Sequence, residues 1–210
     1  MGDSLESERR QALAQFRRDL ILDAARAVFT EHGIAGASLR KIAQAAGATT
    51  GGIYSHYESR QALYADVLWD SMATLTERLE AARGAAAAGA RLAAVLETVF
   101  AFYRERPNDF DLSFYLFGGG GPGSLGKDLD RRLNDQMRGV IELVAEVMVA
   151  EGYAPQADAF PRAVATMTHM FGLVLMFKTG RLKALKQDPR ALLAIHIRDL
   201  ERARSGQGED

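Results

Sequence analysis

Residues 47–60 read GATTGGIYSHYESR, and this short stretch carries two adjacent glycines, Gly51 and Gly52. The flanking pattern predicts a helix here, because Ile53 and Tyr57 are spaced to lie on one inward face. Each glycine costs a helix interior about 1 kcal/mol relative to alanine. A short helix that accepts this cost twice needs a physical reason for the missing side chains.

Two further helices are predicted before this one, so that three short helices follow one another. Residues 20–29 place apolar side chains at helical spacing, and Ser38 is a suitable N-cap for a second helix. Gly47 lies in the turn that follows, and either Thr49 or Thr50 can cap the third helix. Three short helices with a glycine in the second turn predict a helix-turn-helix unit.

The glycines have a reason in such a unit. Its last helix enters the major groove of DNA, which admits a helix only when the helix lies close. Small residues on the groove-facing side permit this approach, and hydroxyls and backbone N–H groups at the helix start can contact phosphates and base edges. Gly51 and Gly52 therefore indicate a helix that lies close to DNA.

The run SLRKIAQAAGATTGGIYSHYESRQALYADVL, residues 38–68, resembles the DNA-binding signature of the tetracycline-repressor (TetR) family. The resemblance rests on IA-x-AAG, GxIYSHY, then Arg60 and Leu63, at this distance from an N-terminal helix that ends in FTEHG. It covers about residues 18–68, and the rest of the chain matches only in helical character and length. It implies an all-α fold, a double-stranded DNA operator, a homodimer and a small effector.

The resemblance also implies roles for particular residues. Ser38 stands where family members cap the second helix and touch a phosphate, and Tyr54 and His56 match phosphate-contacting positions. Basic residues of the first helix are further candidates, although each is also a plausible solvated charge. The expected DNA-binding set is Arg17, Arg18, Ser38, Arg40, Lys41, Thr49, Thr50, Gly51, Gly52, Tyr54, Ser55, His56 and Arg60.

Two positions depart from the family pattern. Gly52 occupies a position more often held by threonine or another small side chain, and Thr50 one often held by lysine. Because the two glycines offer only backbone groups, sequence reading would rest on Thr49, Thr50, Ser55 and DNA shape.

Composition supports this interpretation. The chain has 210 residues, a net charge of −1 and no cysteine, and its basic residues outnumber acidic ones from residue 9 to residue 60. We expect a cytoplasmic protein without a cofactor or metal, in which residues 1–60 form the DNA-binding head, with a polar arm at 1–17. Residues 61–210 are expected to form an effector-binding and dimerisation body of bundled helices.

A glycine-rich stretch supplies a rival function. Gly121, Gly126 and Lys127 fit the first part of a phosphate-binding loop, which would indicate a nucleotide-binding enzyme. Asp128 stands where this motif requires serine or threonine to bind magnesium, so we interpret the stretch as a connection between helices. A helical binding protein that does not read DNA is the other alternative.

The body is expected to bind a small apolar or aromatic effector and to form the dimer. Residues 161–178 predict a helix, and its nearly apolar run at 163–177 is too short for a membrane span and indicates a buried helix. This helix and the helix after Pro189 could pair with a second copy or simply pack within the chain. His169 fits a core or interface position better than a ligand site. The candidate effector pocket comprises Trp69, Met72, Phe102, Tyr103, Phe110, Phe114, Met137, His169 and Met170.

Overall fold

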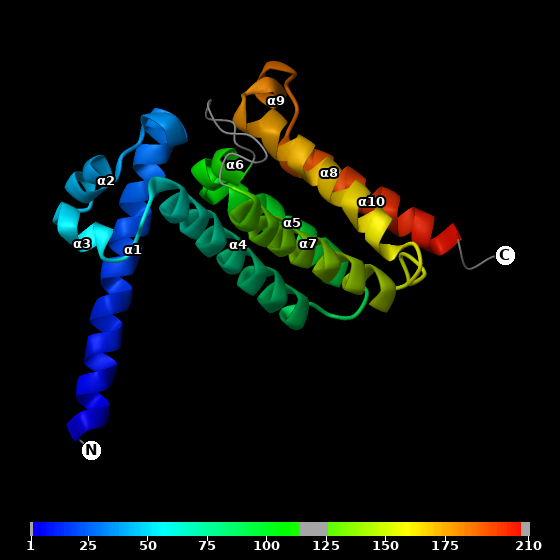
Figure 1. Ribbon diagram of the computed structural model, residues 1–210. Coiled ribbons are helices and arrows are strands. Elements are labelled where there is room, and N and C mark those ends of the chain that lie inside the picture. The colour runs from blue at the N-terminus through cyan, green and yellow to red at the C-terminus, as the bar shows by residue number, and fades with distance from the viewer. Residues whose placement is uncertain (1, 114–125, 207–210) are drawn as a thin grey trace. The chain divides into compact units, whose positions relative to one another are not determined.

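The computed structural model describes residues 2–113 and 126–206, and all regular secondary structure in these two ranges is helical (Figure 1). The predicted all-α fold is therefore confirmed. The helices are α1 (Gly2–Gly36), α2 (Leu39–Ala45), α3 (Thr50–Tyr54), α4 (Arg60–Ala85), α5 (Arg91–Glu105), α6 (Pro107–Ser113), α7 (Lys127–Ala150), α8 (Ala159–Lys178), α9 (Arg181–Ala184) and α10 (Pro189–Gly206).

The chain forms two compact units, and α4 and α7 each contribute to both. The first unit holds residues 1–71 and 108–133, and the second holds residues 72–107 and 134–210. The start of α4, α6 and the start of α7 thus pack with the three N-terminal helices. The predicted division of roles at residue 60 stays a prediction, but the packing of the chain divides elsewhere.

The core of the first unit gathers apolar side chains from α1, α2, α3 and α4. Phe29, Ile42, Ile53 and Leu63 are each fully buried in this cluster. Removing such side chains from water is the main stabilising contribution to a unit of this size. Each short helix therefore holds its place through its inward residues.

Helix α1 is longer than the sequence pattern indicates. It begins at Gly2, so the predicted polar arm at residues 1–17 is helical and continuous with the first core helix. Its helical geometry is interrupted at Gly33, whose φ of 65° is one that glycine adopts without steric cost. The chain can turn at this point into α2.

The second unit packs α5, α7, α8 and α10 around large apolar side chains. Phe102 and Tyr103 lie edge to face, with ring centroids 5.1 Å apart, and Tyr103 also contacts Phe171 of α8. The carboxylate of Glu151 accepts hydrogen bonds from the backbone N–H groups of Gly89, Arg91 and Leu92, at 2.7, 3.1 and 3.1 Å. A residue beyond α7 thereby caps the start of α5.

Helix α8 differs from its prediction in length and in burial. It begins two residues before the predicted range of 161–178 and spans 20 residues, which makes it long and apolar enough to cross a membrane. Only 33% of its most apolar stretch is buried. Ala163, Met167 and Met170 are buried, whereas Val164 and Leu175 are exposed. The helix is buried on one face only.

Two smaller segments complete the comparison with the sequence. Helix α6 ends at Ser113, and residues 114–125 lie outside the described ranges. The four-residue α9 follows Gly180, which has a φ of 71°, and was not predicted.

Candidate nucleic-acid interface

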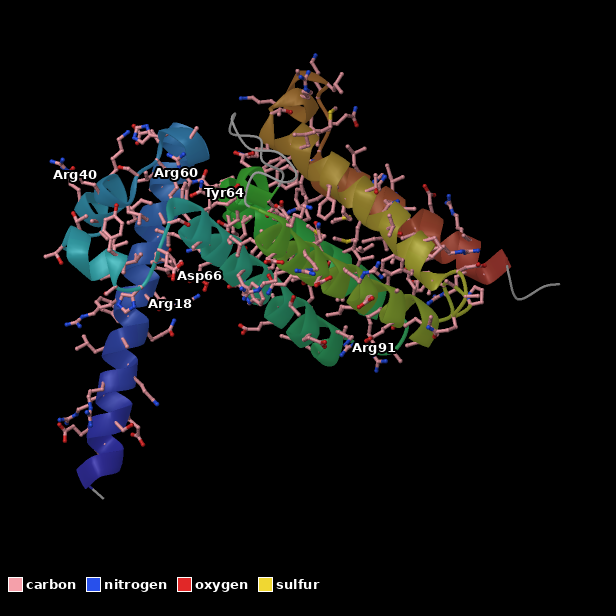
Figure 2. All side chains as sticks on the ribbon, viewed as in Figure 1. Arg18, Arg40, Arg60, Tyr64, Asp66 and Arg91 are labelled. Atoms are coloured by element: carbon pink, nitrogen blue, oxygen red, sulfur yellow. The ribbon has the colours of Figure 1, made fainter. Side chains whose placement is uncertain are left out.

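Helix α2 is held by its predicted cap and by its buried face. The Ser38 hydroxyl accepts a hydrogen bond from the backbone N–H of Lys41 at 3.2 Å, and Leu39, Ile42 and Ala43 are buried. This confirms Ser38 as the N-cap. Arg40 is exposed and projects away from the three-helix core (Figure 2).

Helix α3 is anchored by a single buried side chain. Ile53 is fully buried, and Thr49, rather than Thr50, caps the helix by accepting a hydrogen bond from the Gly52 N–H at 3.1 Å. The remaining side chains from residue 49 to residue 56 are exposed, and Tyr54 retains 58% of its surface. The structure therefore places the predicted contact residues of α3 together on an uncovered surface.

The two glycines of α3 differ in their surroundings. A Cβ at Gly51 would meet no heavy atom within 4 Å in the described parts of the chain. A Cβ at Gly52 would lie 3.1 Å from the Thr49 Oγ1 that caps the helix. A side chain at Gly52 would therefore require a small shift of the Thr49 cap, whereas one at Gly51 would require none.

Two of the predicted basic contacts also stabilise the turn between α1 and α2. Arg60 Nη1 donates to the carbonyls of Ala35 and Ala37 at 3.0 and 3.2 Å, and Lys41 Nζ donates to the carbonyl of Gly36 at 3.1 Å. These cations satisfy carbonyl groups left over where α1 ends. Their ammonium and guanidinium groups stay at the surface next to α2.

The neighbouring arginines of α1 have different environments. Arg17 is exposed and has no ion pair among the described residues, as expected for a side chain available to phosphate. Arg18 instead pairs with Asp66 at 3.1 Å and with Asp70 at 3.4 Å, both on α4 (Figure 2). Arg18 is therefore occupied within the protein, a role that the sequence analysis missed.

The Arg18 ion pairs belong to a network that joins α1 to α4 and α6. The hydroxyl of Tyr57 donates to Asp66 at 2.6 Å, and Arg26 pairs with Asp70. Arg26 Nε also lies 3.5 Å from the carboxylate of Asp109, a residue of α6 that is 2% exposed. The sequence contained one signal for this network. The two arginines of α1 and the two aspartates of α4 each recur at helical spacing, so each pair can lie on one face of its helix.

This network shifts the ionisation of two of its members. Burial and the hydrogen bond to Asp66 raise the pKa of Tyr57, so its hydroxyl keeps its proton and remains a donor. Burial disfavours the charged form of Arg18, but the nearby charges of Asp66 and Asp70 outweigh burial and raise its pKa. The first three helices are thus tied to α4 and α6 by these ion pairs and by the Tyr57 hydrogen bond.

The predicted effector residues are divided between the two compact units, and their grouping into one pocket stays a prediction. Trp69 and Phe110 belong to the first compact unit, whereas Met72, Phe102, Tyr103, Met137, His169 and Met170 belong to the second. Phe102, Tyr103 and Met170 are fully buried, and Phe114 lies outside the described residues. Trp69 is half-buried in the wall of a cavity of about 780 Å³, formed within the first unit.

His169 is exposed on α8 and stacks against His196 of α10. The two rings are 3.7 Å apart and within 10° of parallel. Burial and the neighbouring His169 lower the pKa of His196 to about 4, so the His196 ring is neutral at pH 7. Within the described ranges, no three His, Cys, Asp or Glu side chains gather in a way that could hold a metal ion.

The structure describes only part of the phosphate-loop motif. Gly121 lies outside the described residues, while Lys127 and Asp128 open α7 and Asp128 pairs with Arg131. A carboxylate at this position disfavours a bound phosphate.

A short polar helix seated on a three-helix core, with its outer face uncovered, defines a helix-turn-helix DNA-binding unit. Residues 21–67 match the family "Bacterial regulatory proteins, tetR family", and residues 92–200 match the "Tetracyclin repressor-like, C-terminal domain". The chain belongs to the TetR family and is a DNA-binding transcriptional regulator.

Individual relatives agree with this assignment. The HTH-type transcriptional regulator AcrR of Shigella flexneri is 40% identical over 57 residues, which cover 27% of this chain and 26% of AcrR. The chain therefore matches about a quarter of the length of that curated relative.

Solved structures show the same fold. The fatty acid degradation regulator FadR of Bacillus halodurans aligns with a TM-score of 0.70 at 21% identity, covering 88% of this chain and 94% of its own. FadR of Bacillus subtilis, solved in complex with stearoyl-CoA, gives a TM-score of 0.68 at 21% identity, covering 89% and 97%.

Proposed function

We propose that the protein is a ligand-responsive repressor that binds a near-palindromic operator as a homodimer. The observation that carries this proposal is the uncovered surface of α2 and α3, where polar side chains face outward while Ile53 seats α3 on the core. In this proposal Tyr54, His56, Ser38 and Arg40 contact phosphates. Thr50 and Ser55, with the backbone at Gly51, approach the base edges.

The exposed face of α8 supports the homodimer. Val164 and Leu175 are 38% and 42% exposed, Phe177 of α8 is 36% exposed, and Ile195 of α10 is 45% exposed. Uncovered apolar surface of this kind marks an interaction site. Thr168 and His169 lie on the same helix and are also exposed, which fits a protein partner better than lipid.

An effector would act by preferring one arrangement of the dimer. A ligand shifts an equilibrium only by its differential affinity for the two states, and α4 is the natural lever because it begins beside α3 and continues into the second unit. A small apolar or aromatic effector is supported by the aromatic-rich second unit and by the stearoyl-CoA bound in the B. subtilis FadR structure. No enzymatic activity is part of this proposal.

Substitution of two nearby tyrosines tests the head. Genomic fragments that bind the purified protein are selected first, and one of them is then used as the DNA in fluorescence anisotropy. Tyr54→Ala removes an exposed side chain and should lower affinity by about tenfold or more while the dimer persists. Tyr57→Phe removes a hydroxyl that contacts Asp66, so it should lower thermal stability and leave most DNA affinity intact.

The same experiment separates the alternatives. Binding that falls steeply with salt supports contacts to phosphates. If Tyr54→Ala binds as tightly as the wild type, α3 is not the recognition helix. If no fragment is selected, the chain is a helical binding protein without DNA readout.

A further inference from the structure

The cavity beside Trp69 lies within the first unit, between the first half of α1, the start of α4 and the start of α7. Its volume of about 780 Å³ falls in the range of small-molecule sites. The apolar part of its wall comes from Ile21 of α1, Ala65 of α4 and Leu129 of α7. The cavity is therefore built from three helices of one compact unit.

The wall also contains the indole ring of Trp69 and three guanidinium groups, beside polar groups such as Gln15 and Tyr57. Trp69 is half-buried there, and the guanidinium of Arg132 lies 4.3 Å from the centre of its ring. Arg18 also lines the cavity, but its charge is balanced by Asp66 and Asp70. Because the balanced Arg18 needs no further anion, the remaining cations decide what the cavity attracts.

Arg17 and Arg132 are those remaining cations. Both line the cavity, and neither has an ion pair with a carboxylate in the described parts of the chain. A guanidinium group recognises a carboxylate through two parallel hydrogen bonds. Two uncompensated guanidinium groups beside an apolar and aromatic wall favour an anion that carries a flat apolar body.

The charge of this anion is limited by an acidic group of the wall, Asp66. The carboxylate of Asp66 faces the same cavity and would repel a second negative charge on the occupant. A singly charged carboxylate therefore fits better than a doubly charged phosphate monoester.

We propose that this cavity binds a small aromatic carboxylate, whose ring packs beside Trp69 and whose carboxylate pairs with Arg132 and Arg17. The occupant also touches the DNA-binding surface, because Arg17 and His56 line the cavity and belong to the expected DNA contacts. It therefore competes with DNA for these side chains, a consequence that rests on the proposed function.

The single tryptophan of the chain provides the test of binding. The full-length protein is labelled with 5-fluorotryptophan, and its one fluorine resonance is followed by NMR during titration with 2-naphthoate. The uncharged 2-naphthamide, which has nearly the same shape, is the matched ligand control. The resonance should shift saturably with 2-naphthoate, with an affinity about tenfold higher than for 2-naphthamide.

Substitutions then identify the cations. Arg132→Gln and Arg17→Gln should each weaken 2-naphthoate binding by about five- to tenfold and leave 2-naphthamide binding unchanged. Arg132→Lys keeps the charge without the planar fork and should give an intermediate loss. The control is Arg131→Gln, an exposed neighbour already paired with Asp128, which should leave both titrations as in the wild type.

The outcomes are distinct. Equal affinity for the two probes, an unchanged resonance, or wild-type affinity in Arg132→Gln would each overturn the site. A resonance shift without any loss of affinity for the selected DNA would overturn the competition. If the protein binds no DNA at all, the proposed function fails, and the fluorine titration still decides the cavity.

Discussion

Helices α3 and α8 both leave one face uncovered, but the two faces have opposite chemistry. The outer face of α3 carries glycines, hydroxyls and the ring of Tyr54, with Arg40 exposed on the adjacent α2. The outer face of α8 carries large apolar side chains such as Leu175 and Phe177. Exposure alone therefore identifies neither partner. In the proposed function, the polar face of α3 contacts DNA and the apolar face of α8 contacts a second copy of the chain.

The cost of exposure differs as well. Polar groups on α3 keep their hydration until DNA replaces water, so the uncovered surface is stable in the free protein. Covering the apolar groups of α8 would stabilise the protein by about 25 cal/mol per Å² of apolar surface removed from water. This gain in free energy does not depend on DNA being present. We expect a permanent contact at α8 and a reversible one at α3.

The largest effect is expected from placing a charge on the apolar face. Leu175→Arg should convert the dimer to monomer and lower DNA affinity by about 100-fold or more, because a monomer engages only one half-site. Analytical ultracentrifugation and anisotropy measure the two effects. Gln187→Arg, an exposed change in the loop before α10, is the control and should remain dimeric. If the Leu175→Arg protein stays dimeric, the exposed apolar face of α8 is not the dimer contact.

A methyl group added to α3 should separate stability from DNA binding. Gly51→Ala has space in the free chain and should raise the free energy of unfolding by about 0.5–1 kcal/mol, since alanine favours the helix. The same methyl group would hold α3 away from the groove and lower DNA affinity by about tenfold. Thermal melts measure the change in stability, and anisotropy measures the change in DNA affinity. A Gly51→Ala variant that binds DNA as tightly as the wild type would show that close approach at this residue is unnecessary.

A smaller effect is expected from a single phosphate contact. Arg40→Gln should weaken binding by a few-fold for all DNA sequences alike and lower the slope of log affinity against log salt by about 1. Anisotropy over a range of salt concentrations gives the slope. A change in sequence preference with an unchanged slope would instead place Arg40 at a base edge.

The smallest effect concerns acid stability at α8 and α10. Because the pKa of His196 is lowered to about 4, the unfolded chain takes up a proton below its ordinary pKa of 6.5 before the folded chain does. Stability should therefore fall as the pH drops from about 6.5 to 4, a trend that His169 strengthens and Asp199 opposes. Melting temperatures at pH 7.5 and 5.0 should differ less in His196→Leu than in the wild type; an equal difference in both proteins would assign the trend to other groups.

Local features of the head could be predicted from sequence. The cap at Ser38, the burial of Ile53 and the closeness of the α3 residues depend on neighbours within one or two helical turns. Helix α9 could not be predicted, because a single turn is too short to show periodicity. Residues that pair across long stretches of chain were missed for a different reason: Arg18 and Asp66 are 48 positions apart, and only packing brings them together.

The predicted effector-pocket residues show a second limit of prediction from sequence. Aromatic and methionine residues are equally suited to a closely packed core and to a cavity wall, so composition predicts that they are buried but not whether space remains beside them. In the structure, Trp69 is half-buried and borders a cavity, whereas Phe102 and Tyr103 are fully buried. Only the shape of the surrounding helices decides this difference.

The brevity of α3 has a consequence for how DNA is recognised. A five-residue helix cannot persist alone, because helix nucleation is unfavourable, so its order depends on Ile53 and the Thr49 cap. Its backbone amides should exchange with solvent deuterium faster than those of α4, and bound DNA should slow them. Ordering α3 then lowers the net free energy of operator binding. On mismatched DNA sequences, the ends of α3 would stay partly unfolded.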